Sequence, residues 1–230
     1  MIRRMLFRIL LTTIGVLVLY QGWLLAKVCW YTTHNPSSSA LMDERLAQIR
    51  QDHPDARLQQ RWVPYAGIAP SLRRAVIASE DSTFMQNNGF DWKGIHDAAQ
   101  KDLQHGRIVA GGSTITQQLA KNLFLSDHRT PGRKLEEAII TVMLSHCMSK
   151  RRILELYLNL IEWGNGLFGA EAAARHYYGT SASRLSAVQS ARLAAMIPDP
   201  RYYDNHRNAR GMLRHAATIE ARMQQVGAPR

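Results

Sequence analysis

An uncharged apolar run from Ile9 to Ala26 constrains the fold of this chain more than any other feature of its sequence. A helix over this run, rising 1.5 Å per residue, is about 27 Å long, close to the hydrocarbon thickness of a bilayer. Basic residues precede the run and aromatic residues gather at its far end: Arg3, Arg4 and Arg8, then Tyr20, Trp23, Trp30 and Tyr31. This arrangement predicts a transmembrane helix with a cytoplasmic N-terminus and the bulk of the chain outside the cytoplasm.

Two alternative interpretations of the apolar run fit its surroundings less well. A cleaved signal peptide has a shorter apolar core, and the following AKVCWYTTH lacks a clean small-x-small cleavage site. A buried core helix leaves the basic flank unexplained, as well as the polar residues 35–39, which are typical of a linker. The expected organisation is therefore a basic tail at 1–8, a transmembrane helix at 9–28, a linker at 29–45 and one folded domain at 46–230.

Composition and charge narrow the class of protein further. Hydrophobic residues make up 46% of the 230 residues, which excludes a disordered chain. The formal net charge of +11 is spread along the sequence, which suits anionic lipid or phosphate as well as nucleic acid. No nucleic-acid partner is expected, because these basic residues are spread over a domain predicted to lie outside the cytoplasm. The two cysteines, Cys29 and Cys147, make neither a disulfide framework nor a zinc site.

Helical spacing and helix punctuation predict a mainly α-helical body. Thr114 (or Ser113), Ser149 and Ser186 precede apolar-periodic segments as N-caps do, and Gly179 follows one as a C-cap does. The sequence contains no phosphate-binding P-loop, dinucleotide fingerprint, HExxH zinc motif or GxSxG motif, and no SxxK with KTG. Carboxylates, amides and cations therefore remain as the candidates for chemistry.

The densest polar motif is GGSTITQQLAKN, from Gly111 to Asn122. Thr114 and Gln117 have the spacing of a capping box, so a helix begins here with its free amides pointing outward. Four residues then recur at helical spacing and predict one polar face: Thr114, Gln117, Gln118 and Lys121. A helix N-terminus with a cation on the same face can bind phosphate or pyrophosphate, whereas an ordinary solvated helix face is the alternative.

Two further motifs contain acids. Glu80 and Asp81 follow an apolar helical run at 72–78, where partial desolvation suits a carboxylate for general acid or base chemistry. In HRTPGRKLEEAII, Arg129 could bind an anionic leaving group, and Glu137 could orient the nearby cations or help hold a divalent metal. Taken alone, each of these motifs is better explained by helix-end structure.

Together, and in this order, the motifs resemble those of the peptidoglycan glycosyltransferases of glycosyltransferase family 51. The matching segments are ED..F....GFD from Glu80, GGSTITQQLAKN, RK..EA from Arg133 and SKRRILELYLN from Ser149. The resemblance covers roughly residues 60–202 and extends to the G.G.FG.E.AA..YYG and L....A.LAAMIP.P segments. Since the chain is short, anchored and without transpeptidase motifs, it is similar to the monofunctional biosynthetic members.

The resemblance implies an all-α, lysozyme-like head with a smaller apolar jaw that contacts the membrane. It implies that lipid II and the growing glycan strand are the substrates, joined by a β-1,4 bond with release of undecaprenyl pyrophosphate. The expected location is the bacterial inner membrane, with the catalytic domain in the periplasm, where cell-division and peptidoglycan synthase proteins are candidate partners.

The resemblance also assigns roles to residues. Glu80 corresponds to the general base, and Glu137 to the second glutamate, which assists pyrophosphate departure directly or through a divalent cation, Mg or Mn. Lys121 and Arg129 correspond to the cations that stabilise the pyrophosphate. The expected donor-site residues are Ser113, Thr114, Gln117 and Gln118, and the expected supporting residues are Asp81, Asn122 and Arg133.

Two positions depart from the family pattern. Asn87 stands where many members carry His and cannot titrate, and Ser145 stands where an acidic residue is frequent. The helix SKRRILELYLN has core spacing and is expected to support the active-site helices without touching substrate. A lysozyme-like lytic glycosidase and a catalytically silent membrane-anchored scaffold of the division machinery are the alternative functions.

Overall fold

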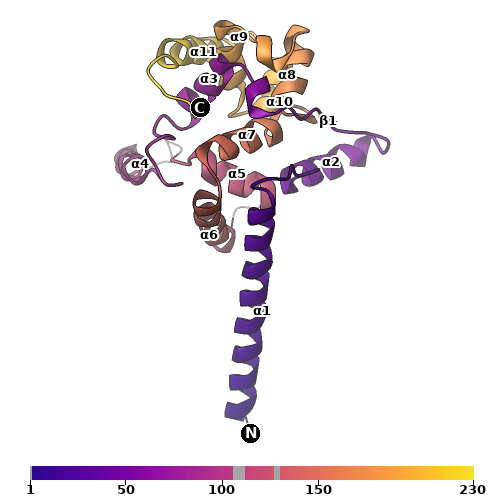
Figure 1. The fold of residues 1–230 in the computed structure, drawn as a ribbon, viewed down its shortest axis with the longest axis vertical. Helices are drawn as coiled ribbons and strands as arrows, with labels where there is room; N and C mark the ends of the chain where they lie inside the picture. Colours follow the sequence, from indigo (N-terminus) through magenta and orange to yellow (C-terminus); the bar gives the residue numbers. More distant parts are fainter. Residues whose placement is uncertain (1, 106–111, 127–129) are drawn as a thin grey trace.

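The computed structural model describes residues 2–105, 112–126 and 130–230. A long helix, α1 (Ile2–Trp30), projects from a helical body made by the rest of the chain, and the N-terminus lies at its far end (Figure 1). Among these residues the body contains one small sheet of very short strands. The predicted fold class, an all-α head preceded by one apolar helix, is confirmed.

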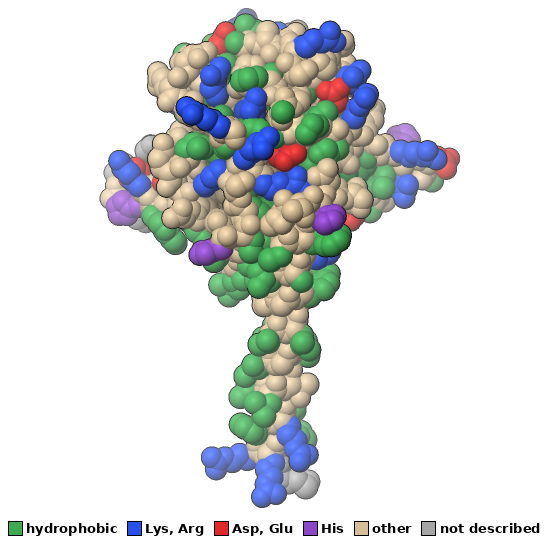
Figure 2. Space-filling model, viewed as in Figure 1, with side chains coloured by type: hydrophobic (Ala, Val, Ile, Leu, Met, Phe, Trp, Pro, Cys, Tyr) green, Lys and Arg blue, Asp and Glu red, His purple; other side chains and the backbone are tan. Residues whose placement is uncertain are grey.

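Helix α1 is apolar around most of its circumference. The most apolar 18-residue stretch of this helix has a mean hydropathy of 1.9, and only 6% of that stretch is buried within the protein. Figure 2 shows hydrophobic side chains along this helix and a group of basic side chains at its free end, where Arg3, Arg4 and Arg8 are exposed. Leu24 and Val28, near its C-terminal end, are buried against the body. A helix that is apolar on all sides and uncovered is matched to lipid rather than to water.

The other elements follow in three groups. Before the central helices come α2 (Ala40–Asp52), β1 (Gln59–Gln60), η1 (Tyr65–Gly67), α3 (Pro70–Glu80) and α4 (Trp92–His105). The central helices are α5 (Ile115–Phe124), α6 (Pro131–Cys147) and α7 (Lys150–Leu160). The last group is β2 (Glu162–Gly164), β3 (Leu167–Phe168), α8 (Ala170–Tyr178), η2 (Ala182–Arg184), α9 (Ala187–Met196), α10 (Pro200–Asn205) and α11 (Arg210–Arg222).

Helix boundaries agree with the caps expected from the sequence. Thr114, Ser149 and Ser186 are the N-caps of α5, α7 and α9, and the first and last of these form complete capping boxes. Gly179 ends α8 with a φ of 61°, a left-handed conformation that glycine adopts without a steric penalty. These boundaries are local, which is why short sequence signals locate them.

The segment expected as a linker at 29–45 is partly helical. Helix α1 continues to Trp30, and α2 begins at Ala40, capped by Ser39, whose Oγ accepts a hydrogen bond from the Met42 amide. Arg45 of α2 is buried, so this part of the segment belongs to the body. The small sheet was also not expected, because β1 pairs in parallel with β3 across a large sequence separation and β2 pairs with β3 as a hairpin.

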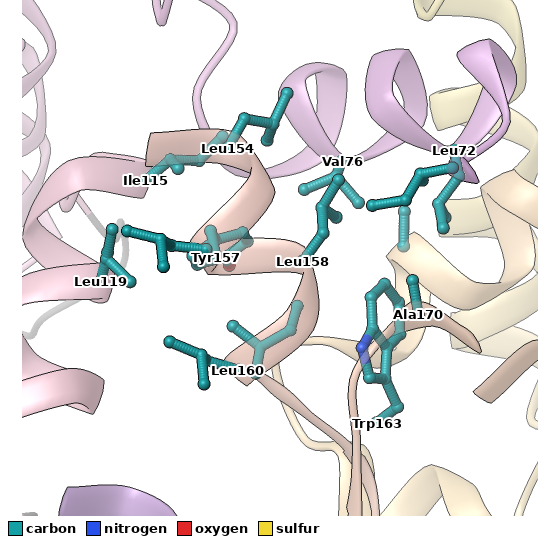
Figure 3. Packing of buried hydrophobic residues seen from close by; sticks show 14 of the residues in the cluster. Leu72, Val76, Ile115, Leu119, Leu154, Tyr157, Leu158, Leu160, Trp163 and Ala170 are labelled. Atoms are coloured by element: carbon teal, nitrogen blue, oxygen red, sulfur yellow. The ribbon is translucent and has the colours of Figure 1, made fainter. Parts of the chain in front are cut away.

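Helix α7 runs through the centre of the body. Leu154, Tyr157, Leu158 and Leu160 are fully buried on it, and Figure 3 shows Leu158 pointing toward Val76 of α3. The surrounding side chains come from α3 on one side and from α5 on the other: Leu72, Val76, Ile115 and Leu119. Burial of this apolar surface fixes the ends of α3 and α5 next to each other.

Candidate functional site

A cleft of about 550 Å³ opens where α3, α5 and α7 meet the segment between α9 and α10. Five of the site residues expected from the sequence are in its wall: Glu80, Ser113, Gln118, Lys121 and Asn122. Glu80 is the last residue of α3, Ser113 directly precedes the cap of α5, and the other three are on α5. Residues from separate motifs are thus brought together at a single concave surface.

Glu80 is held at the cleft by two hydrogen bonds. Its Oε1 accepts from Ser79 Oγ at 2.9 Å, and its Oε2 accepts from Gln118 Nε2 at 3.1 Å. Gln118 is itself oriented by Tyr157, whose hydroxyl donates to Gln118 Oε1 at 2.7 Å. Burial, reinforced by the negative charges of Glu80 and Asp81, raises the pKa of Tyr157 well above its usual value, so this hydroxyl remains a donor.

Thr114 and Gln117 do not line the cleft. Their side chains cap the start of α5 instead. Both are buried, and each accepts a hydrogen bond from the backbone amide of the other, at 3.2 Å to Thr114 Oγ1 and 3.0 Å to Gln117 Oε1. Thr114 Oγ1 also donates to the Gly89 carbonyl at 2.7 Å. The expected polar face of α5 is therefore divided, because capping uses its first turn while Gln118 and Lys121 face the cleft.

Asp81 is buried beside the cleft and connects three elements. Its Oδ2 accepts from the Ile115 amide at 3.1 Å, and its Oδ1 accepts from Asn87 Nδ2 at 2.9 Å. Asn87 Oδ1 in turn accepts from Lys150 Nζ at 3.2 Å. Burial raises the pKa of Asp81, although the hydrogen bonds that its carboxylate accepts act in the opposite direction. Burial lowers the pKa of Lys150, because in both residues it disfavours the charged form.

Glu137 forms a separate ionic cluster on α6. It is 3% exposed, accepts from Arg133 Nη1 at 2.9 Å and also pairs with Lys134. Within the described ranges, Glu137 and Arg133 are not in the wall of the cleft. Arg129 lies outside the described residues.

The described residues do not suit a divalent cation at Glu137. Both of its carboxylate oxygens are engaged by cations, and no group of three His, Cys, Asp or Glu that could hold a metal occurs in the described part of the chain. A hard divalent cation requires several oxygen ligands. The hypothesis of a metal held by Glu137 therefore gains no support from this donor set.

Part of the cleft wall consists of residues for which the sequence predicted no role in the site. Tyr157 belongs to the helix that was expected only to support the site, yet it lines the cleft. Arg45 and Glu162, which form a buried ion pair at 3.1 Å, also line it, as do Asp199 and Arg201. Burial raises the pKa of Glu162, opposed by the Arg45 charge. These residues come from elements that are distant in sequence. Only Asp199 lies in a short recognisable pattern, between Pro198 and Pro200 in the segment L....A.LAAMIP.P.

The sequence of the chain is similar to those of known transglycosylases. The family model described as Transglycosylase matches residues 44–224. A biosynthetic peptidoglycan transglycosylase of Methylobacillus flagellatus is 60% identical over the whole of both chains. Proteins of the same name from Chromobacterium violaceum and Nitrosospira multiformis are 57% and 53% identical, each covering at least 98% of both chains.

The match begins within α2 and includes every residue named above in the cleft wall. It extends past α11, which the sequence motifs did not reach. A match over most of the chain, together with full-length relatives at more than half identity, establishes both the family and its reaction. The chain is accordingly a member of the transglycosylase family, and it polymerises the glycan strands of peptidoglycan in cell-wall synthesis.

Proposed function

We propose that the cleft joins a lipid-linked glycan strand to lipid II. The 4-hydroxyl of the incoming N-acetylglucosamine attacks the anomeric carbon of the strand's terminal N-acetylmuramic acid. As the β-1,4 bond forms, the bond from that carbon to the pyrophosphate oxygen breaks, and undecaprenyl pyrophosphate leaves. The observation that carries this proposal is that Glu80 and Lys121, a base and a cation, line the same cleft.

Glu80 is the general base in this scheme and takes the proton of the attacking hydroxyl. Its two hydrogen bonds, from Ser79 and Gln118, fix the carboxylate while leaving it at the cleft surface. Tyr157 acts on Glu80 indirectly, because its hydroxyl orients the side-chain amide of Gln118. Such a chain holds the base in one orientation before substrate arrives, which favours proton transfer.

Lys121 stabilises the departing pyrophosphate, with Ser113 and Asn122 beside it in the cleft wall. Ser113 directly precedes the N-cap of α5, where the helix dipole also favours an anion. By the family resemblance, Arg129 adds a second cation to this leaving-group site.

Glu137 acts as a positioning residue in this proposal. Its carboxylate pairs with both Arg133 and Lys134 and holds them at the first turns of α6. The Mg or Mn that the resemblance implies finds no suitable donor set around Glu137 among the described residues, so no step is assigned to a cation.

The location and limits of the activity are part of the same proposal. The basic end of α1 remains in the cytoplasm, and the body lies on the periplasmic face of the inner membrane, where division and synthase proteins could meet it. No transpeptidase activity is expected, since the 230 residues contain no SxxK with KTG and the relatives named transglycosylases match over their full length.

Polymerisation of labelled lipid II by the full chain in detergent tests the proposal, with glycan length resolved on a gel. We expect Glu80→Gln to lower the rate by about 10²–10⁴-fold, the usual contribution of a general base. Lys121→Ala should weaken donor binding and turnover together. Glu220→Gln, an isosteric change on α11, is the matched control.

The assay also separates the alternatives. Wild-type polymerisation by Glu80→Gln would overturn the assignment of the base. Release of muropeptides from preformed glycan would instead support a lytic glycosidase, and absence of any turnover by the folded chain would support a scaffold.

A further inference from the structure

The two cysteines of the chain lie next to each other where the membrane helix joins the body. Cys29 is in the last turn of α1 and Cys147 is the last residue of α6, and their Sγ atoms are 3.6 Å apart. Both are free thiols in this structure, with Cys29 exposed and Cys147 partly buried. Nothing in the proposed reaction uses either thiol.

The pair lies at one end of a packed contact between two helices. Toward the membrane, the Tyr20 hydroxyl donates to the carboxylate of Glu136, and between the two contacts Leu24 and Val28 are buried. Residue 20 of α1 thus contacts residue 136 of α6, and residue 29 contacts residue 147. Since the residue numbers rise together along both helices, α1 and α6 run side by side in the same direction. The approach of the cysteines follows from this packing.

The backbone that follows Cys29 is also fixed. Arg152 Nε donates to the Tyr31 carbonyl at 2.9 Å, and its Nη2 donates to the His34 carbonyl at 2.7 Å. The Tyr31 ring packs against Phe124 with centroids 6.1 Å apart. The sulfur atoms, 3.6 Å apart, must approach to the bonded distance of about 2.05 Å, and they do so at a junction whose following backbone is held in place.

The sequence pattern predicted no disulfide framework from these two residues, but the structure places their sulfur atoms side by side. We propose that Cys29 and Cys147 form a single intrachain disulfide that fastens the membrane helix to α6. The oxidant is a second disulfide, either a small molecule or a protein. The exposed Cys29 thiolate attacks it and forms a mixed disulfide, releasing one thiol. Cys147 then loses its proton and attacks the Cys29 sulfur, the mixed disulfide breaks, and the second thiol of the oxidant leaves with that proton.

The bond would fix the helix that carries Glu137 relative to the membrane anchor. Helix α6 bears the ion pairs of Glu137 with Arg133 and Lys134, and α1 contacts the same helix. Formation of the bond in cells rests on the periplasmic placement proposed above, because disulfides persist in oxidising compartments. Its formation in the purified chain does not depend on that placement.

Thiol trapping on the full chain in detergent tests the proposal. The reduced protein is treated with oxidised glutathione, quenched with acid and alkylated with N-ethylmaleimide, and the mass gives the number of free thiols. We expect the thiol count to fall from two to none, with a Cys29–Cys147 peptide in a monomeric chain and a higher unfolding temperature. Two alkylated thiols, or links only between chains, would overturn the proposal.

The double variant Cys147→Ser, Ser145→Cys is the matched control. It moves the thiol two residues along α6 to a position that faces Gly89, on another side of the helix. No intrachain bond should form in this variant, and an equal yield would contradict the proposed geometry.

The same alkylation, applied to living cells before lysis, tests the physiological state. A chain with both thiols alkylated would overturn the disulfide in the membrane. Polymerisation of lipid II by the reduced chain is measured separately. A reduced chain that does not polymerise lipid II would contradict the proposed function but not the disulfide.

Discussion

Asn87 bridges two charged side chains near the cleft. It donates to Asp81 at 2.9 Å and accepts from Lys150 at 3.2 Å, and its Oδ1 also accepts from the Gly89 amide at 3.1 Å. Asp81 in turn holds the first residue of α5 through the Ile115 amide. This role requires simultaneous donation and acceptance, which a neutral amide provides without titrating.

Replacement of Asn87 by alanine should therefore lower stability. Asp81 loses a donor and Lys150 loses an acceptor in a partly buried place, which costs about 1–2 kcal/mol. For a chain of this size the unfolding temperature should fall by about 2–8 °C, measured by thermal unfolding in detergent. Asn88→Ala, at the exposed neighbouring position, is the control and should change it little. Equal effects of the two variants would show that the bridge contributes nothing.

Glu80, the proposed base, and Glu137, the proposed positioning residue, should differ in their effects on stability. Glu137 is almost fully buried between Arg133 and Lys134, whereas Glu80 is only partly buried and faces the cleft. Glu137→Gln leaves Arg133, which is 14% exposed, without a countercharge. Loss of one partner of a buried pair costs about 3 kcal/mol.

We expect Glu137→Gln to lower the unfolding temperature by about 6–12 °C, whereas Glu80→Gln leaves it nearly unchanged while polymerisation is lost. Melting curves and lipid II assays on the same preparations compare these outcomes. A Glu137→Gln chain that is inactive yet melts like the wild type would contradict the positioning role and favour direct participation.

At the scale of elements, the cap of α5 connects folding with the site. Thr114 accepts from the Gln117 amide, as Ser186 accepts from the Gln189 amide in the second capping box on α9. Thr114 additionally donates to the Gly89 carbonyl within a buried contact, whereas Ser186 is exposed. The same local motif therefore has an additional tertiary role in α5 only.

Thr114→Ala should destabilise the chain by about 2 kcal/mol, against about 1 kcal/mol or less for Ser186→Ala. Because α5 carries Gln118 and Lys121, Thr114→Ala should also lower the polymerisation rate, which Ser186→Ala should not. Thr114→Ser retains the hydroxyl and should restore both quantities. Identical losses in the two alanine variants would indicate that capping alone matters.

The elements also show what the sequence could predict. The caps of α5, α7, α8 and α9 involve residues within four positions of the helix end, so spacing alone located them. Helix α2 and the three-stranded sheet depend on contacts distant in sequence, such as Gln59 with Leu167. Sequence periodicity carries no information on such pairings, and both were missed.

The same distinction applies to the cleft. Glu80, Gln118 and Lys121 were found because their motifs are short and polar. Tyr157 has the spacing of a core residue and is indeed buried, but its hydroxyl reaches Gln118 on a neighbouring helix. Arg45 and Glu162 meet only because α2 folds onto the body. Their place in the site depends on tertiary contacts that no single motif records.

At the scale of the whole molecule, the anchor and the body share one interface. Val28 is fully buried, and Arg152 binds the carbonyls of Tyr31 and His34 just beyond the helix. The end of α1 therefore contributes to the core of the body as well as to membrane attachment. Removal of the lipid-facing part alone should leave this contribution intact.

Two truncated chains test this distinction. A chain starting at Lys27 keeps Val28 and the carbonyls bound by Arg152, whereas one starting at Ser38 loses all three contacts. A buried valine contributes about 1.5 kcal/mol and each hydrogen bond from a charged group about 1.5 kcal/mol or more. The shorter chain should therefore melt on the order of 10 °C lower than the longer one.

Thermal unfolding of both chains in the same detergent measures the difference, and equal unfolding temperatures would show that the junction does not stabilise the body. Binding to lipid vesicles provides the complementary reading. Both chains lack residues 9–26, so both should lose most of the membrane affinity of the full chain. If the two chains bind vesicles equally weakly but differ in unfolding temperature, the two roles of α1 are separate. The lipid-facing part of the helix then determines membrane attachment, and its last turn stabilises the body.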